Sequence, residues 1–427
     1  MSDAARTPVR PAEPAAFDVE TMRREFPVLA RRVHGHPLAY LDNGASSQAP
    51  RRVIEAVDDY ARSHHANVHR GVHTLSEEAT ARYEGARDRV ARWLNAASRT
   101  EIVFTRGTTE AVNLVAQSYA RPQLRAGDEV LITHLEHHAN IVPWQMVCEQ
   151  TGAKLVVAPI DERGELDPDA VEALMGPRTR VFACAHVSNA LGTVLPVERL
   201  VASARARGIA TLVDGAQAVP HGAVDVRALG CDFYAFSGHK MYAPTGIGAL
   251  YGRESMLERM PPWQGGGDMI LTVSFERTTY NALPYKFEAG TPNIADAVAF
   301  GPALDYLSAV GLDAIRAHED ELAAKAVALL EASPSVFVLG PKDPARRSGV
   351  VSFNVAGLHP HDVGTIFDLE GVAVRVGHHC AQPVHRRFGV AATSRASAGV
   401  YTTDDEVEAF REALSGVRAF FGLEGDQ

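Results

Sequence analysis

Short apolar runs alternate with helix-length amphipathic stretches between residues 100 and 252. Most of these runs are apolar on successive residues rather than on alternate ones, which is typical of parallel strands covered on both faces. The pattern predicts seven strands, at 102–105, 129–133, 155–160, 180–185, 210–214, 233–236 and 248–251. Strands separated by helices indicate an α/β fold. We therefore expect a large domain with a mainly parallel seven-stranded sheet.

The last ninety residues follow a different order of elements. Strand patterns at 336–339, 350–355, 372–376 and near 396–401 accompany a helix at 361–370. A closing helix follows, and Thr403 and Glu406 at its start have the spacing of a capping box. This order predicts a smaller C-terminal α+β domain.

Two signals near the N-terminus complete the organisation. Thr74 and Glu77 form a second predicted capping box, ahead of a helix that ends near Asn95. The first sixteen residues are rich in alanine, proline and arginine, and they offer little to bury. We expect a disordered tail over 1–16, an N-terminal segment and large domain over 17–300, and a small domain over 301–427.

Composition and charge narrow the classes of protein. The 427 residues are 46% apolar and 22% charged, which excludes collagen-like, largely disordered and coiled-coil chains. A net charge of −10 disfavours nucleic acid as a partner. No apolar run approaches the ~18 residues of a membrane span, and no secretory signal opens the chain. Four cysteines without a Cys-x-x-Cys pair suit a reducing compartment, so we expect a cytoplasmic protein with free thiols.

Nucleotide-binding motifs are missing from the predicted parallel sheet. The sequence contains no Gly-Lys dipeptide, which excludes the phosphate loop of nucleotide triphosphatases. No Gly-x-Gly-x-x-Gly phrase follows the first strand either. These absences disfavour ATP and NAD as ligands.

The scarcity of lysine is informative, because only five of the 42 basic residues are lysine. An amine can form a Schiff base, whereas the guanidinium of arginine stays protonated and cannot. Lys240 directly follows a predicted strand, at the sheet edge where open α/β folds bind ligands. Lys286 is a second candidate, and the remaining three have surface contexts: Lys154, Lys325 and Lys342.

Two further positions suit pyridoxal phosphate. The segment from Arg106 to Thr109 joins a strand to a helix, so its amides and hydroxyls could hold a phosphate. Asp214 ends another strand, where a buried carboxylate could keep a pyridine nitrogen protonated. Both positions have a simpler interpretation as a helix cap.

Several histidines lie near strand ends. His137 and His138 could stack on a flat ring or merely solvate the edge of a loop. His378, His379 and His385 surround Cys380, which raises the question of zinc. Adjacent residues seldom bind one ion tetrahedrally, and no paired ligand spacing is present, so we expect no metal site.

Cys380 is the candidate nucleophile. Gly377, two imidazoles and Arg375 precede it, and cationic neighbours favour the reactive thiolate. The other cysteines lie within apolar runs and are expected to be packing residues; they are Cys148, Cys184 and Cys231.

Taken together, these residues resemble one family over nearly the whole chain. The sequence is similar to the group II, Suf-type cysteine desulfurases of the class V aminotransferases, which are fold-type I pyridoxal phosphate enzymes, with selenocysteine lyases as near relatives. The most specific phrases are Ser237-Gly238-His239-Lys240 and Arg375-Val376-Gly377-His378-His379-Cys380-Ala381. Further matching phrases lie at 41–45, 70–76, 106–110, 136–140, 186–189, 213–217 and 289–293.

The resemblance assigns a role to each matching residue. It implies that Lys240 binds pyridoxal 5'-phosphate covalently and later moves protons at the substrate α-carbon. His137 would stack on the pyridine ring, Asp214 would pair with its nitrogen, and Gln217 would bond its phenolic oxygen. The phosphate would be held by Thr108, Thr109, Ser237 and His239, with Thr291 reaching in from the partner subunit of a homodimer.

The same resemblance implies a reaction. Asn189 and Arg395 would grip the carboxylate of L-cysteine, and Cys380 would take its sulfur as a persulfide while L-alanine leaves. The sulfur would supply iron-sulfur cluster assembly. His361 stands where relatives served by a zinc-binding SufU-like acceptor carry histidine, so we expect that acceptor rather than a SufE-like one. Alternative functions are a selenocysteine lyase and a non-catalytic sulfur-assembly scaffold.

Overall fold

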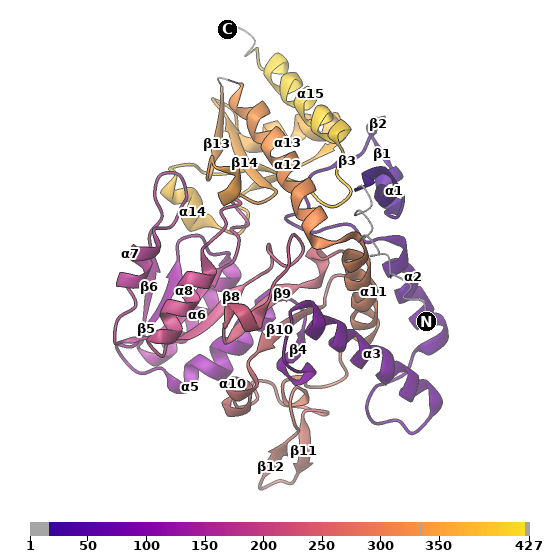
Figure 1. Cartoon of the computed structure of the whole chain (residues 1–427), viewed down its shortest axis with the longest axis vertical. Helices are drawn as coiled ribbons and strands as arrows, with labels where there is room; N and C mark the ends of the chain where they lie inside the picture. The colour runs from indigo at the N-terminus through magenta and orange to yellow at the C-terminus, as the bar shows by residue number, and fades with distance from the viewer. Residues whose placement is uncertain (1–16, 334, 423–427) are drawn as a thin grey trace, which may run out of the picture.

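The computed structural model describes residues 17–333 and 335–422, and a seven-stranded sheet forms its largest layer (Figure 1). The strand order is β4-β10-β9-β8-β7-β5-β6. All neighbours from β9 to β6 are parallel, whereas β10 is antiparallel to both β9 and β4. The strands are β4 (Ile102–Thr105), β5 (Glu129–Thr133), β6 (Lys154–Ala158), β7 (Thr179–Ala185), β8 (Ala210–Asp214), β9 (Phe233–Ser237) and β10 (Gly248–Gly252). The predicted α/β sheet is confirmed, with small shifts at the ends of some strands.

The sheet is apolar on both faces because both are covered by helices. In β9, Phe233 and Ala235 belong to one buried cluster, while Tyr234 and Phe236 belong to another. One face is covered by α3 (Thr74–Trp93), α8 (Val197–Ala206) and α11 (Ile294–Val310). The other is covered by α4 (Thr108–Leu114), α6 (Val142–Thr151) and α10 (Glu254–Arg259). This double coverage explains the continuous apolar runs of the sequence.

The C-terminal part contains an antiparallel sheet of four strands and its own buried core, as predicted. The order is β13 (Val336–Leu339), β14 (Val350–Val355), β17 (Thr393–Ser397) and β16 (Arg375–Gly377). The helices α12 (Leu312–Glu331), α13 (Pro360–Leu369) and α15 (Asp404–Phe420) contribute to that core. A short helix, α14 (Gln382–Arg387), lies between β16 and β17. The capping box of Thr403 and Glu406 is confirmed at the start of α15.

Three local predictions were wrong. The strand expected near 396–401 is β17, which ends at Ser397 because the chain then leaves the sheet. The strand expected at 372–376 is divided into β15 (Val372–Ala373) and β16. The predicted capping box of Thr74 and Glu77 does not form, since His73 is the residue before α3 and its Nδ1 accepts from the amide of Ser76 at 3.3 Å.

The N-terminal segment packs against the C-terminal part. β3 (Ala39–Tyr40) pairs in parallel with β15. In α1 (Val19–Arg23), Arg23 forms an ion pair with the buried Glu406 at 3.0 Å. The proposed boundary between 300 and 301 falls inside α11, and the division into 17–300 and 301–427 stays a prediction. The expected tail over 1–16 lies outside the described residues.

The hairpin of β11 (Ile270–Val273) and β12 (Thr278–Tyr280) projects from the end of the molecule opposite the C-terminal part (Figure 1).

Within the described ranges, no single helix is long and apolar enough to cross a membrane. Only α11 and α12 taken together, bent by 77°, meet that length and composition test.

Candidate active site

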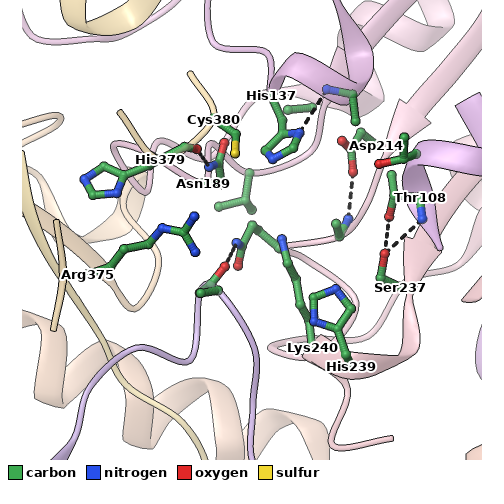
Figure 2. A pocket seen from close by; sticks show the side chains of 18 of the residues that line it. Thr108, His137, Asn189, Asp214, Ser237, His239, Lys240, Arg375, His379 and Cys380 are labelled. Atoms are coloured by element: carbon green, nitrogen blue, oxygen red, sulfur yellow. Dashed lines mark hydrogen bonds between the residues drawn. The ribbon is translucent and has the colours of Figure 1, made fainter. Parts of the chain in front are cut away.

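The carboxyl ends of the central strands meet the C-terminal part at a cavity of about 150 Å³. Chain segments that follow β4, β5, β7, β8 and β9 line one side, as expected for the ligand-binding edge of an open α/β sheet. Residues from the segment 375–395 complete the wall. Figure 2 shows Lys240 and Cys380 pointing into this space from different elements.

The turn after β4 forms a polar cup with the end of β9. Gly107 has a φ of 149°, a conformation that favours glycine, and a Cβ there would lie only 3.0 Å from Ser237 Oγ. The amide of Thr108 donates to Ser237 Oγ at 2.9 Å, and the two hydroxyl oxygens are 2.8 Å apart. Thr109 and His239 line the same cavity. The four residues predicted to hold phosphate therefore lie together.

Lys240 follows β9 and lines the cavity. Its amine makes no hydrogen bond or ion pair with any residue that the structure describes. Burial lowers the pKa of this amine to about 8, with smaller contributions from Arg395 and Arg375, while Asp214 opposes the shift. About a tenth of the amine is therefore unprotonated at pH 7, far more than for an ordinary lysine, and this fraction can act as a nucleophile.

Asp214 and His137 line the cavity as predicted. Asp214 Oδ1 accepts from the amide of Ala216 at 3.0 Å, and burial raises the pKa of this carboxyl. His137 Nδ1 accepts from the amide of Ala139 at 3.0 Å. Burial, followed by the charge of Lys240, lowers the pKa of His137 to about 3. The histidine is thus a neutral, flat ring, which suits stacking better than it suits acid catalysis.

Glu136 anchors the turn that carries this histidine, and its contribution was missed from the sequence. Its fully buried carboxylate accepts from Thr133 Oγ1 at 2.5 Å, from the amide of Ala185 at 3.0 Å and from Asn140 Nδ2 at 2.6 Å. Burial raises the pKa of Glu136 to about 8. These bonds join the ends of β5 and β7 to the turn that carries His137. An acidic residue three positions after the end of an apolar strand was the available signal.

The loop that carries Cys380 is held by the large sheet. Asn189 Nδ2 donates to the carbonyl of His379 at 2.5 Å, and the amide of His138 donates to the carbonyl of Cys380 at 2.7 Å. Asn189 and His138 follow β7 and β5, respectively. Cys380 is therefore held at the same edge of the sheet as the polar cup.

Arg395 lies on β17 and is 1% exposed. Its Nη1 donates to the carbonyl of Asn189 at 2.8 Å, and its Nη2 pairs with Asp42 Oδ1 at 3.2 Å. Desolvation lowers the pKa of Arg395 to about 10, so the guanidinium remains charged at neutral pH. Arg375 brings a second guanidinium to the cavity. From the sequence, this residue was noted only as a cationic neighbour of Cys380.

Thr291 and His361 lie apart from this cavity. Thr291 is exposed and lines a separate cavity of about 360 Å³ with Arg106 and Gln264. His361 is exposed near the start of α13. The alternative lysine, Lys286, donates to the carbonyl of Glu258 and does not line the main cavity. The other three cysteines are buried, as predicted.

Comparisons with known proteins agree with this geometry. The family model of the class-V aminotransferases matches residues 39–410. A cysteine desulfurase of Cronobacter sakazakii is 51% identical, covering 95% of this chain and 100% of that protein. A probable cysteine desulfurase of Streptomyces coelicolor is 49% identical, covering 96% and 99%. The cysteine desulfurase CsdA of Escherichia coli is a structural neighbour, with a TM-score of 0.87, 40% identity and coverage of 95% and 99%. The chain belongs to the cysteine desulfurases of the class-V aminotransferase family.

The wall of the desulfurase cavity fits pyridoxal phosphate, the cofactor of this family. Four buried polar atoms of this wall have no hydrogen-bond partner among the described residues: Asn189 Oδ1, Gln217 Oε1, His379 Nδ1 and Arg395 Nε. Such atoms are costly unless a ligand satisfies them. The glycine turn and hydroxyls suit a phosphate, the unpaired amine suits an aldehyde, and Asp214 suits a ring nitrogen. When bound, this cofactor supplies an electron sink for the substrate α-carbon.

The lowered pKa of Lys240 predicts how the apoprotein takes up its cofactor. Only the unprotonated amine can attack an aldehyde, so the rate of reconstitution should rise roughly tenfold per pH unit and level off above about pH 8. Asp214→Asn removes the charge that raises this pKa, and the midpoint should therefore move to lower pH. Stopped-flow absorbance of pyridoxal phosphate capture measures both profiles. A midpoint near the ordinary value of 10.5 would contradict the assignment, and Lys240→Arg gives the background without capture.

Proposed function

We propose that this desulfurase converts L-cysteine to L-alanine and retains the sulfur on Cys380 as a persulfide. The observation that carries the proposal is that Lys240 and Cys380 line one cavity, although 139 positions separate them in the chain. Arg395 and Asn189 would bind the substrate carboxylate, because both line the cavity and both have a hydrogen to donate. Arg395 Nε has no partner among the described residues, and Asn189 Nδ2 has a second hydrogen beside the one that it donates to the carbonyl of His379.

The proposed steps give each group of the cavity one role. The Lys240 amine accepts the proton of the substrate α-carbon. The Cys380 thiolate then attacks the substrate sulfur, so that an S–S bond forms as the C–S bond breaks and its electron pair stays with carbon. Lys240 returns a proton to complete alanine. His137, neutral at working pH, orients the reacting plane rather than exchanging protons.

Two alternatives share the scaffold. A non-catalytic sulfur-assembly protein would not need a nucleophilic amine and a thiol in one cavity, and their presence favours an enzyme. A selenocysteine lyase would use the same groups, and the choice of selenium over sulfur depends on the reaction at Cys380.

Product analysis tests this function. The wild-type holoenzyme with L-cysteine and a reductant should release equal amounts of alanine and sulfide. Cys380→Ser should keep the yellow cofactor yet lose about a hundredfold or more in sulfide release, because the sulfur acceptor is gone. Lys240→Ala should lose the covalent link and turnover together. Cys148→Ser, a buried thiol outside the cavity, is the matched control. Wild-type protein that makes alanine only from selenocysteine would favour the lyase.

We also propose that the enzyme is a homodimer in which Thr291 completes the phosphate site of the partner subunit. Thr291 is exposed and lies outside its own cavity, although its phrase matches a family cofactor motif. The projecting β11–β12 hairpin adds apolar side chains that are unusual on a free surface. They include Leu271 at 68% exposure, Val273 at 64% and Phe275, which is fully exposed.

Mixed dimers test the role of Thr291. Thr291→Ala homodimers should bind pyridoxal phosphate about tenfold more weakly, since one phosphate hydrogen bond is lost. In a heterodimer with Lys240→Ala, the subunit that keeps Lys240 receives Thr291 from its partner and should recover normal affinity. Tagged heterodimers and cofactor titration give the measurement. Affinity that stays weak in the heterodimer would place Thr291 in its own subunit's site, and a monomer in solution would exclude the proposal.

For sulfur transfer, we propose a cytoplasmic Suf-type system with a zinc-binding SufU-like acceptor that docks at His361. His361 is exposed, and its ring stacks on His359 with centroids 5.4 Å apart and an interplanar angle of 8°. An imidazole held at a fixed angle can replace a ligand on a partner's zinc and free a thiolate there. The sulfur would serve iron-sulfur cluster assembly, with a SufE-like acceptor as the alternative.

Separating the two half-reactions tests His361. His361→Ala should leave persulfide formation on Cys380 unchanged, because the residue lies outside the cavity. Transfer to a zinc-loaded acceptor should fall about tenfold or more, since the displacing ligand is lost. Radiolabelled sulfur followed from enzyme to acceptor distinguishes the two steps, and His65→Ala, an exposed histidine of the N-terminal segment, is the control. Equal transfer by the variant and the wild type would refute this role.

A further inference from the structure

Three buried side chains form a continuous hydrogen-bonded chain behind the Cys380 loop. His379 Nε2 lies 2.7 Å from Thr393 Oγ1, and the same oxygen lies 3.0 Å from His385 Nε2. His385 Nδ1 in turn lies 3.1 Å from the carbonyl oxygen of Ala381. These three residues, His379, Thr393 and His385, are each at most 3% exposed. The chain therefore begins and ends on the residues that flank Cys380.

The donors in this chain can be assigned from its ends. A carbonyl only accepts, so His385 Nδ1 carries a hydrogen, and its Nε2 in the neutral ring must accept from the Thr393 hydroxyl. The hydroxyl has then used its one hydrogen, and His379 Nε2 must donate to it. Burial lowers the pKa of His379 to about 2 and also lowers that of His385, so both rings are neutral. The carbonyl of Ala381 thus sets the tautomer of His385, and the Thr393 hydroxyl passes this choice on to His379.

The backbone near Cys380 needs such support. His379 and Cys380 have φ values of 50° and 55°, and two consecutive non-glycine residues in the left-handed region persist only where their surroundings hold them. The carbonyls of both residues are bound by groups from the large sheet, Asn189 and His138. Thr393 lies opposite Gly377 in the pairing of β17 with β16, so it anchors the loop from the other side.

The side chain of His379 is held away from the reacting groups. Its ring points away from Lys240 in Figure 2, while its carbonyl faces Asn189. The imidazole therefore fastens the loop and leaves the neighbouring thiol directed at the cavity. Cys380 and His379 line that cavity, whereas Thr393 and His385 do not.

We infer that Thr393 is a positioning residue for sulfur transfer, whose hydroxyl holds the Cys380 loop in its left-handed conformation through His379 and His385. The inference rests on the proposed role of Cys380 as sulfur acceptor. Without the hydroxyl, two buried imidazole nitrogens lose their partner, and the loop relaxes toward ordinary backbone angles. The thiol then turns from the cavity toward solvent.

Kinetics of the holoenzyme test this inference. Thr393→Val keeps the shape of the side chain and removes the hydroxyl. We expect kcat to fall about tenfold or more while KM for L-cysteine stays within about twofold, because Arg395 and Asn189 remain in place. Alkylation of Cys380 by iodoacetamide, followed by mass spectrometry, should become faster. Thr393→Ser should restore both values to within about threefold, since it restores the hydroxyl.

Two further variants keep the test decisive. Thr179→Val removes a hydroxyl from another buried threonine, at the opposite end of β7, and should leave kcat and alkylation unchanged. If Thr393→Val does not retain the cofactor, His385→Phe replaces it, with the same loss of kcat expected. Wild-type kcat and alkylation in the valine variant, or in His385→Phe, would overturn the inference. A serine variant as slow as valine would overturn it as well. Failure of the wild type to make alanine would instead reject the proposed function.

Discussion

The buried amine of Lys240, which has no partner among the described residues, is the constraint on which the site depends. An ammonium group loses its hydration in such a place, and without a paired carboxylate the proton is held weakly. The pKa of the amine is therefore about 8. Covalent capture of an aldehyde requires the unprotonated amine, and the lowered pKa increases its share near neutral pH. The same desolvation that disfavours the ammonium form therefore makes the amine reactive.

The fold supplies this environment by joining two layers of different construction. Parallel strands β5, β7, β8 and β9 end together, so groups from distant positions meet without long loops. The antiparallel sheet of the C-terminal part closes the cavity with Arg375, Cys380 and Arg395. Asn189 connects the two, because its amide binds the Cys380 loop and its carbonyl binds Arg395. Cofactor groups and the nucleophile thus share one rigid frame.

Sequence patterns predicted the sheet well because its strands are buried on both faces. They failed where tertiary contacts override local signals. The capping box of Thr74 lost to His73, and the last strand ends at Ser397 because the chain turns toward the N-terminal segment. The cavity-lining residues followed from strand ends and family motifs. Thr393 could not be found that way, because its role depends on three-dimensional contacts with residues from another element. Glu136 lies after a strand and within a matching phrase, but only the structure shows its bond to the amide of Ala185 on a neighbouring strand.

Charge balance explains why this cavity selects anionic ligands. Three basic groups lie in a small buried volume: Lys240, Arg375 and Arg395. Arg395 and Arg375 lower the pKa of Lys240, and Arg375 also lowers the pKa of Arg395. Burial meanwhile raises the pKa of Asp42 and Asp214, so the acids compensate the cations incompletely. The phosphate of the cofactor and the proposed substrate carboxylate would supply the missing negative charge in a medium of low dielectric constant, where charge interactions are strongest. The cavity is therefore complementary to the ligands that its geometry accommodates.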